Sequence, residues 1–281
     1  MTRATSKQQQ QGFTLIELLT ALGIFLVICG AAFTLLGSSQ QRYQTESQVL
    51  TSFQEARLGL DQIVRDVNDA GFPPPTFTDG NPTHFASSPF AWSSGSGYAV
   101  TRCQIGTAGG GTCTTATDSS PGDFDLIIET NPNPQDPSCA PNCKVQWIRY
   151  QLQGTTLMRA MVDKGPTGTD PDVATSPNLA PFVQNVVNNS TAAQIAQYQL
   201  THPGMFPGGN PMPIFSYTCD TPSAPQPQPP PCPGAGADNS PANIRDVMIT
   251  LIVSAPTPDA TTGVPRIVQL SGRGRRVNPN Q

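Results

Sequence analysis

The stretch FTLIELLTALGIFLVICGAAFTLL, residues 13–36, decides the fold of this 281-residue chain. It contains a single charged side chain, Glu17. As an α-helix it would extend about 36 Å, which is enough to cross the hydrocarbon core of a bilayer. The residues before it, 1–12, are polar and basic. We therefore predict a membrane-spanning helix that follows a short basic leader.

A secretory signal peptide also begins with a basic region and an apolar run. Two features favour a helix that is retained. The run is longer than a usual signal core, and the small residues 37–39 lead directly into more helical sequence. Glu17 is the second feature, because an acid inside a membrane span is costly and usually has a functional partner. Glu17 could also complement the positive end of the helix dipole, and both roles can hold.

The apolar pattern continues past the span as one face of an amphipathic helix. Apolar or small residues recur at spacings of 4, 3, 4, 3, 4 and 3, at Val49, Phe53, Ala56, Leu60, Ile63, Val67 and Ala70. The polar residues Gln54, Glu55, Asp61, Arg65 and Asp69 lie off this stripe. Gly71, Phe72 and three prolines end the helix. A free coiled coil would show the same period, but we favour a helix whose outer half packs on its own domain.

Residues 12–17, Gly12-Phe13-Thr14-Leu15-Ile16-Glu17, follow a basic leader and open the apolar run, and they resemble the processing motif of type IV prepilins and type II secretion pseudopilins. The resemblance implies that a prepilin peptidase cleaves between Gly12 and Phe13 and that the new Phe13 amine is methylated. Residues 56–72 are similar to the corresponding segment of PilW-family minor pilins. Thr34 stands where many major pilins have a helix-kinking proline, which favours a minor subunit.

The chemistry of the motif fits this resemblance. Cleavage would create an amine about one helical turn from the Glu17 carboxylate. In a filament, the amine of a neighbouring subunit could neutralise Glu17. Such a pair in an apolar core would set the axial register of the subunits, because misplacement leaves a buried charge unpaired.

Beyond residue 72, short runs of alternating apolar residues predict an antiparallel sheet. These runs are Phe124–Thr130, Val145–Gln153, Thr155–Val162, Ile214–Thr218, Ile244–Ser254 and Arg266–Leu270. The clearest unit is a hairpin that turns at Gly154. We predict an α+β, type IV pilin-like fold in four parts: leader 1–12, membrane and filament-core helix 13–36, amphipathic continuation 37–71 and exported sheet domain 72–281.

Pro-rich and Gly-rich segments separate the strands, and we expect them to be surface insertions or binding loops. They cover residues 73–97, 106–122, 131–143, 164–181 and 203–243. The chain has 30 prolines and 25 glycines, and only 12% of it is charged, which fits an irregular, loop-rich body.

Six cysteines lie in the polar remainder, whereas Cys29 lies in the apolar run. An even number in an exported domain predicts up to three disulfides, and the sequence leaves fifteen connectivities open. We take close pairing as the expectation, with Cys103 to Cys113, Cys139 to Cys143 and Cys219 to Cys232. Zinc is the weaker interpretation, because the CAPNC at 139–143 has no second pair at the right spacing.

The charged residues point to no catalytic or nucleic-acid function. The net charge is −4, and the basic cluster Arg273, Arg275 and Arg276 is expected to be a solvated tail. Asp123 and Asp125 could touch calcium, but a solvated strand start is the favoured interpretation. No motif for a catalytic nucleophile, a metalloprotease or a phosphate loop is found in the sequence. We expect no enzyme activity, cofactor or metal.

These features predict a structural minor pilin that takes part in type IV pilus assembly or priming. Its expected partners are the prepilin peptidase, other pilins or pseudopilins, and an inner-membrane assembly platform. It would sit in the inner membrane with its C-terminal domain in the periplasm, and later in a filament at the cell surface. A minor pseudopilin of type II secretion is the alternative. A single-pass membrane-anchored adhesin is more remote.

Overall fold

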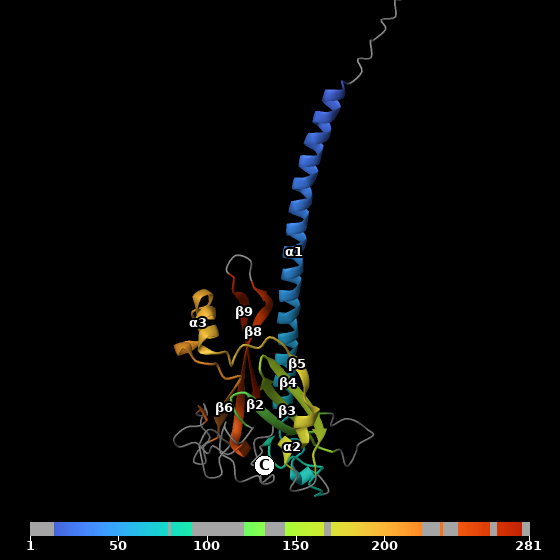
Figure 1. Cartoon of the computed structure of the whole chain (residues 1–281). Helices are drawn as coiled ribbons and strands as arrows, with labels where there is room; N and C mark the ends of the chain where they lie inside the picture. Colours follow the sequence, from blue (N-terminus) through green and yellow to red (C-terminus); the bar gives the residue numbers. More distant parts are fainter. Residues whose placement is uncertain are drawn as a thin grey trace, which may run out of the picture. The chain divides into compact units, whose positions relative to one another are not determined.

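The computed structural model describes residues 14–77, 80–91, 121–132, 144–165, 170–220, 231–232, 241–258 and 263–276. The chain divides into two compact units, Met1–Gln48 and Val49–Gln281. Helix α1 (Leu15–Asn68) begins in the first unit and ends in the second, and antiparallel sheets follow it (Figure 1). This arrangement confirms the predicted α+β class.

The second half of α1 packs on the sheet domain through the predicted apolar stripe. Ala56, Ile63, Val67 and Ala70 are fully buried, whereas the polar residues predicted to lie off the stripe are exposed. The helix ends at Asn68, slightly before the predicted end. Gly71 follows with a φ of 84°, and its amide donates to the carbonyl of Glu129 at 2.8 Å. The preference for packing over a free coiled coil is confirmed for this half of the helix.

The first sheet contains five strands in the order β1-β2-β3-β4-β5. They are β1 (Phe90–Ala91), β2 (Asp125–Thr130), β3 (Gln146–Gln153), β4 (Thr156–Asp163) and β5 (Ala180–Val183). The predicted hairpin is present, since β3 and β4 pair antiparallel across Gly154, which has a φ of 59°. β1 and β5 were not expected, and β5 begins inside a segment predicted to be an insertion.

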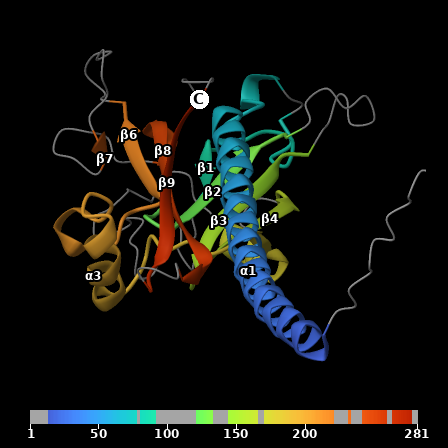
Figure 2. The same cartoon turned by 90° about the horizontal axis from the view of Figure 1, so that it is seen from above.

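The second sheet contains four strands in the order β7-β6-β8-β9. They are β6 (Phe215–Cys219), β7 (Pro231–Cys232), β8 (Ile244–Pro258) and β9 (Pro265–Arg275). Figure 2 shows β6, β8 and β9 side by side. A disulfide joins Cys219 to Cys232, with their Cα atoms 5.7 Å apart, and attaches β7 to this sheet.

Short helices lie in the connections between the longer elements, and α3 and η3 lie in the segment that joins the two sheets. They are η1 (Pro75–Phe77), α2 (Pro171–Thr175), η2 (Ser176–Asn178), α3 (Ala192–Thr201), η3 (Pro207–Gly209) and η4 (Pro241–Asn243). The sequence analysis did not predict α3. Thr191 and Gln194 form a capping box at its start, and Ile195 and Tyr198 pack in a cluster with Ile252 of β8.

The main core lies between α1 and the two sheets; the strands β1 to β8 contribute buried residues to it, and β9 contributes the partly buried Val268 and Leu270. On β9, glycines let the helix approach closely. A Cβ atom on Gly274 would lie 2.4 Å from a methyl of Val67, and one on Gly272 would lie 2.9 Å from a methyl of Val64. Side chains at these two positions would therefore displace α1.

The opposite face of the first sheet carries a buried ion-pair cluster. Arg149 is 1% exposed and donates from Nε and Nη2 to the two carboxylate oxygens of Asp125, at 3.0 and 2.6 Å. Its Nη1 also donates to Asp172 of α2 and, at 2.9 Å, to the Ser176 hydroxyl. The cluster ties α2 and η2 to the sheet. For Asp125, the prediction of a solvated strand start is therefore wrong, although Asp123 is exposed.

The pKa of Asp125 predicts how stability depends on pH. Burial raises this pKa from 3.8 to about 6, because desolvation outweighs the hydrogen bonds from Arg149 and Gln151. A carboxyl with a higher pKa in the folded state binds protons more readily when folded. The free energy of unfolding should therefore fall by about 1–3 kcal/mol as the pH rises through this window, from about 4 to about 6. Urea unfolding of the full chain in detergent would measure this, and Asp125→Asn should flatten the slope. An unchanged slope would contradict the assignment.

The cluster of arginines near the C-terminus is not a solvated tail, so that prediction is wrong. Arg273 and Arg275 belong to β9, and Arg273 donates to the buried carboxylate of Asp246 at 2.7 Å. Arg276 is 4% exposed and donates to the carbonyl of Ala242 and, at 3.4 Å, to Asp220. The reason is that β9 pairs with β8 along its whole length, which holds these residues on the sheet.

Candidate processing and assembly site

Helix α1 opens with a long apolar segment that none of the other described residues buries. Within the described residues, α1 is the helix that is long and apolar enough to cross a membrane. Its large apolar side chains between Leu15 and Leu36 are 52–78% exposed. In water such a surface would be strongly unfavourable, so it requires lipid or other apolar helices around it. The predicted span therefore has the surface of a membrane or filament-core helix.

Glu17 closes a capping box with Thr14 at the start of this helix. The Thr14 amide and hydroxyl donate to Glu17 Oε2 at 3.0 and 2.9 Å, and the Glu17 amide donates to the Thr14 hydroxyl at 3.3 Å. These contacts satisfy backbone amides that would otherwise lack acceptors inside an apolar phase. Glu17 thus has a local role at the start of the helix, as the helix-dipole interpretation allowed.

Thr14 was not predicted to be part of the site. The signal was available, because Thr14-Leu15-Ile16-Glu17 is a Thr-x-x-Glu pattern that precedes an apolar run. Gly12 and Phe13, the predicted cleavage and methylation residues, lie outside the described residues. So do four of the cysteines expected in disulfides, Cys103, Cys113, Cys139 and Cys143. Cys29 is a free thiol on the helix.

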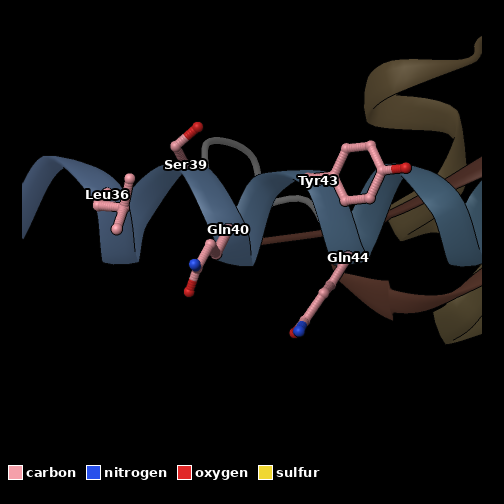
Figure 3. Close-up of a pocket in the computed structure, with 5 residues that line it drawn as sticks. All are labelled: Leu36, Ser39, Gln40, Tyr43 and Gln44. Carbon is pink, nitrogen blue, oxygen red and sulfur yellow. The ribbon is translucent and has the colours of Figure 1, made fainter.

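Past the apolar segment, α1 carries a polar and aromatic face. Leu36, Ser39, Gln40, Tyr43 and Gln44 line a shallow, open depression along one side of the helix (Figure 3). Tyr43 is 75% exposed. A depression on a single helix, open on most sides, is too shallow to enclose a small molecule. Among the described residues, no group of three or more His, Cys, Asp or Glu could hold a metal ion.

Polar contacts at Asp66 fix helix α1 to the sheet domain. The hydroxyl of Tyr150 donates to Asp66 Oδ2 at 2.5 Å, and Nη2 of Arg159 donates to the same oxygen at 3.1 Å. The guanidinium of Arg159 also lies over the rings of Tyr150 and Phe182, 5.6 and 5.9 Å from their centroids. These bonds orient the end of α1 on the first sheet.

Comparison with known proteins adds one finding. No curated protein and no solved structure matches the chain. Residues 7–33 match the family model described as the prokaryotic N-terminal methylation motif. That range contains the predicted cleavage site, the Thr14–Glu17 capping box and most of the exposed apolar segment. The motif and the apolar helix fit a single-pass, membrane-anchored protein, and over this N-terminal segment the chain is similar to type IV pilins and pseudopilins.

Proposed function

We propose that the chain is a structural minor pilin of the PilW type that takes part in the assembly or priming of a type IV pilus. The observation that carries the proposal is the prepilin-type methylation motif at the start of a helix of 54 residues. In this proposal residues 1–12 are the leader, 13–36 the membrane and filament-core helix, and 37–71 its amphipathic continuation. Residues 72–281 are the exported sheet domain.

The proposed sequence of events follows from the surface of α1. The apolar segment first holds the precursor in the inner membrane, where prepilin peptidase cuts between Gly12 and Phe13 and the new amine is methylated. The subunit then leaves the bilayer for the core of a filament, where apolar side chains of neighbouring helices replace lipid. Glu17 would pair there with the amine of a neighbouring subunit and set its axial position.

The mass of the mature N-terminus tests the processing step. We expect protein purified from membranes to begin at a methylated Phe13 and to lack residues 1–12. Tandem mass spectrometry of the N-terminal peptide would measure this. An intact leader, or a cut after residue 36, would contradict the proposal and would favour a membrane-anchored adhesin or a secreted protein.

The phenotype of a deletion strain tests which filament the subunit joins. We expect loss or strong reduction of surface pili with protein secretion unchanged. Loss of secretion with normal pili would instead assign the chain to a type II secretion pseudopilus. A wild-type copy should restore the lost function in either case.

A further inference from the structure

Strand β9 ends its sheet without a neighbouring strand. It is the last member of the order β7-β6-β8-β9, and its register with β8 is continuous from Arg275, opposite Asp246, to Ile267, opposite Ser254. Among the residues that the structure describes, no strand pairs with one long side of β9. An edge of this length is a template for another extended chain unless it is covered.

The direction of the β9 amides can be followed from the bonds at its end. The amide of Arg276 donates to the carbonyl of Arg245, toward β8, at 3.2 Å. The amide of Arg275 points the other way and donates to the Asn68 side chain of α1 at 2.8 Å, in an exposed setting. Because amides alternate along a strand, those of Arg273, Ser271 and Gln269 also point away from β8. Within the described part of the chain, these three amides have no acceptor, and their residues are exposed.

The charge of β9 restricts what could pair with it. The strand contains three arginines, Arg266, Arg273 and Arg275, and no acid, in a chain whose net charge is −4. The side chains of Arg273 and Arg275 are 55% and 58% exposed even though both lie near the buried Asp246. They lie on one face of the strand with Gln269 and Ser271, since side chains alternate between faces. An incoming strand would therefore meet cations beside an open row of amides.

We infer that β9 is a docking strand for an extended, acidic peptide segment of a partner protein, which adds to the sheet beside residues 267–273. The backbone of the segment accepts hydrogen bonds from the outward amides, and its carboxylates pair with Arg273 and Arg275. A second copy of β9 is disfavoured because each copy carries three arginines and no acid, so the pair would gather cations at one edge without a counter-charge. A nucleic acid is disfavoured because the chain is acidic overall and Asp246 already neutralises part of the cluster.

Binding of a designed peptide to the full chain in detergent micelles tests this inference. The probe is a fluorescein-labelled peptide of about seven residues, in which Glu alternates with Val and Thr, and its fluorescence anisotropy is measured. We expect binding at least about 10-fold tighter than that of the same peptide with Lys in place of Glu. Alternate amides of an extended peptide point to opposite edges, so two further peptides are N-methylated, one on each edge. Strand pairing depends on which edge is methylated, whereas charge attraction does not. The edge that pairs with β9 should lose about 3- to 10-fold in affinity, and the other edge should lose little.

The substitution Gln269→Pro removes one outward amide of β9 without removing a bond to β8, and Gln269→Ala is its matched control. We expect the proline variant to bind the acidic peptide about 3- to 10-fold more weakly than the alanine variant. If the proline variant fails to fold, the N-methylated peptides still decide the question. Equal binding of the acidic and Lys peptides, no effect of N-methylation on either edge, or displacement by an equally charged single-stranded oligonucleotide at lower concentration would each overturn the inference.

Discussion

Glu17→Ala is expected to abolish filament incorporation while leaving membrane insertion intact. Removal of the only charge in the apolar segment makes that segment more favourable in lipid, so the variant should be found in the membrane at normal levels. In the filament core, however, the amine of the neighbouring subunit would lose its partner, and an unpaired buried charge costs about 3–5 kcal/mol. We expect at least a 100-fold loss of the subunit from purified filaments, measured by immunoblot against the membrane fraction.

Two further variants separate the assembly role of Glu17 from its capping role. Thr14→Val removes the capping hydroxyl but retains the carboxylate, so it should weaken the start of the helix by about 1 kcal/mol and leave incorporation largely intact. Glu17→Gln retains a hydrogen-bond acceptor for the Thr14 amide but carries no charge, so it should fail to assemble. If Thr14→Val were as defective as Glu17→Ala, the cap rather than the charge would be the essential feature, and the register argument would fail.

Local periodicity predicted those parts of the fold in which one face of an element is uniformly apolar. The stripe from Val49 to Ala70 repeats at helical spacing without interruption, and the structure buries it. The β3–β4 hairpin was predictable because two alternating runs flank a single glycine with positive φ. In both cases the residues that determine the structure are close together in the sequence.

The elements that were overlooked depend on partners far away in the sequence. The inward face of the last part of β9 consists of Gly272 and Gly274, which give no apolar signal, so the strand was predicted to end at Leu270. These glycines are needed because Val64 and Val67 of α1 lie against them, and this contact cannot be read from the sequence of β9 alone. The burial of Asp125 could not be predicted either, because it depends on distant residues. Its partner Arg149 is on the next strand, and Asp172, which also contacts Arg149, lies after the β3–β4 hairpin.

The candidate site also contains a part that is local in sequence and a part that is not. The predicted cleavage residues, the apolar span and Glu17 form one continuous sequence motif, so they could be recognised together. Tyr150 and Arg159, which hold Asp66, are on β3 and β4, and the sequence does not show that they meet the helix.

Gly274→Ala is expected to destabilise the sheet domain severely, although it adds only one methyl group. The new Cβ atom would lie 2.4 Å from Cγ1 and 2.6 Å from Cβ of Val67. Because the Cβ atom of Val67 is attached directly to the backbone, a change of rotamer cannot relieve this overlap. Overpacking of this kind costs about 1–3 kcal/mol or more, a large part of the stability of a typical domain. Urea unfolding of the full chain in detergent, followed by tryptophan fluorescence, would measure the loss.

Gly204→Ala is the matched control, because nothing lies within 4 Å of the Cβ atom that it would add and its φ is not positive. We expect a change of about 0.5 kcal/mol or less for this variant. The decisive comparison adds Val67→Ala, which removes the Cγ1 methyl that would lie 2.4 Å from the new Cβ atom and leaves only the Val67 Cβ contact at 2.6 Å. The double variant should be more stable than the sum of the single effects predicts, by about 1–2 kcal/mol, because the two changes act on one contact. Strict additivity would mean that α1 does not lie against β9 at this point, and it would also remove the basis for placing Asn68 beside the amide of Arg275.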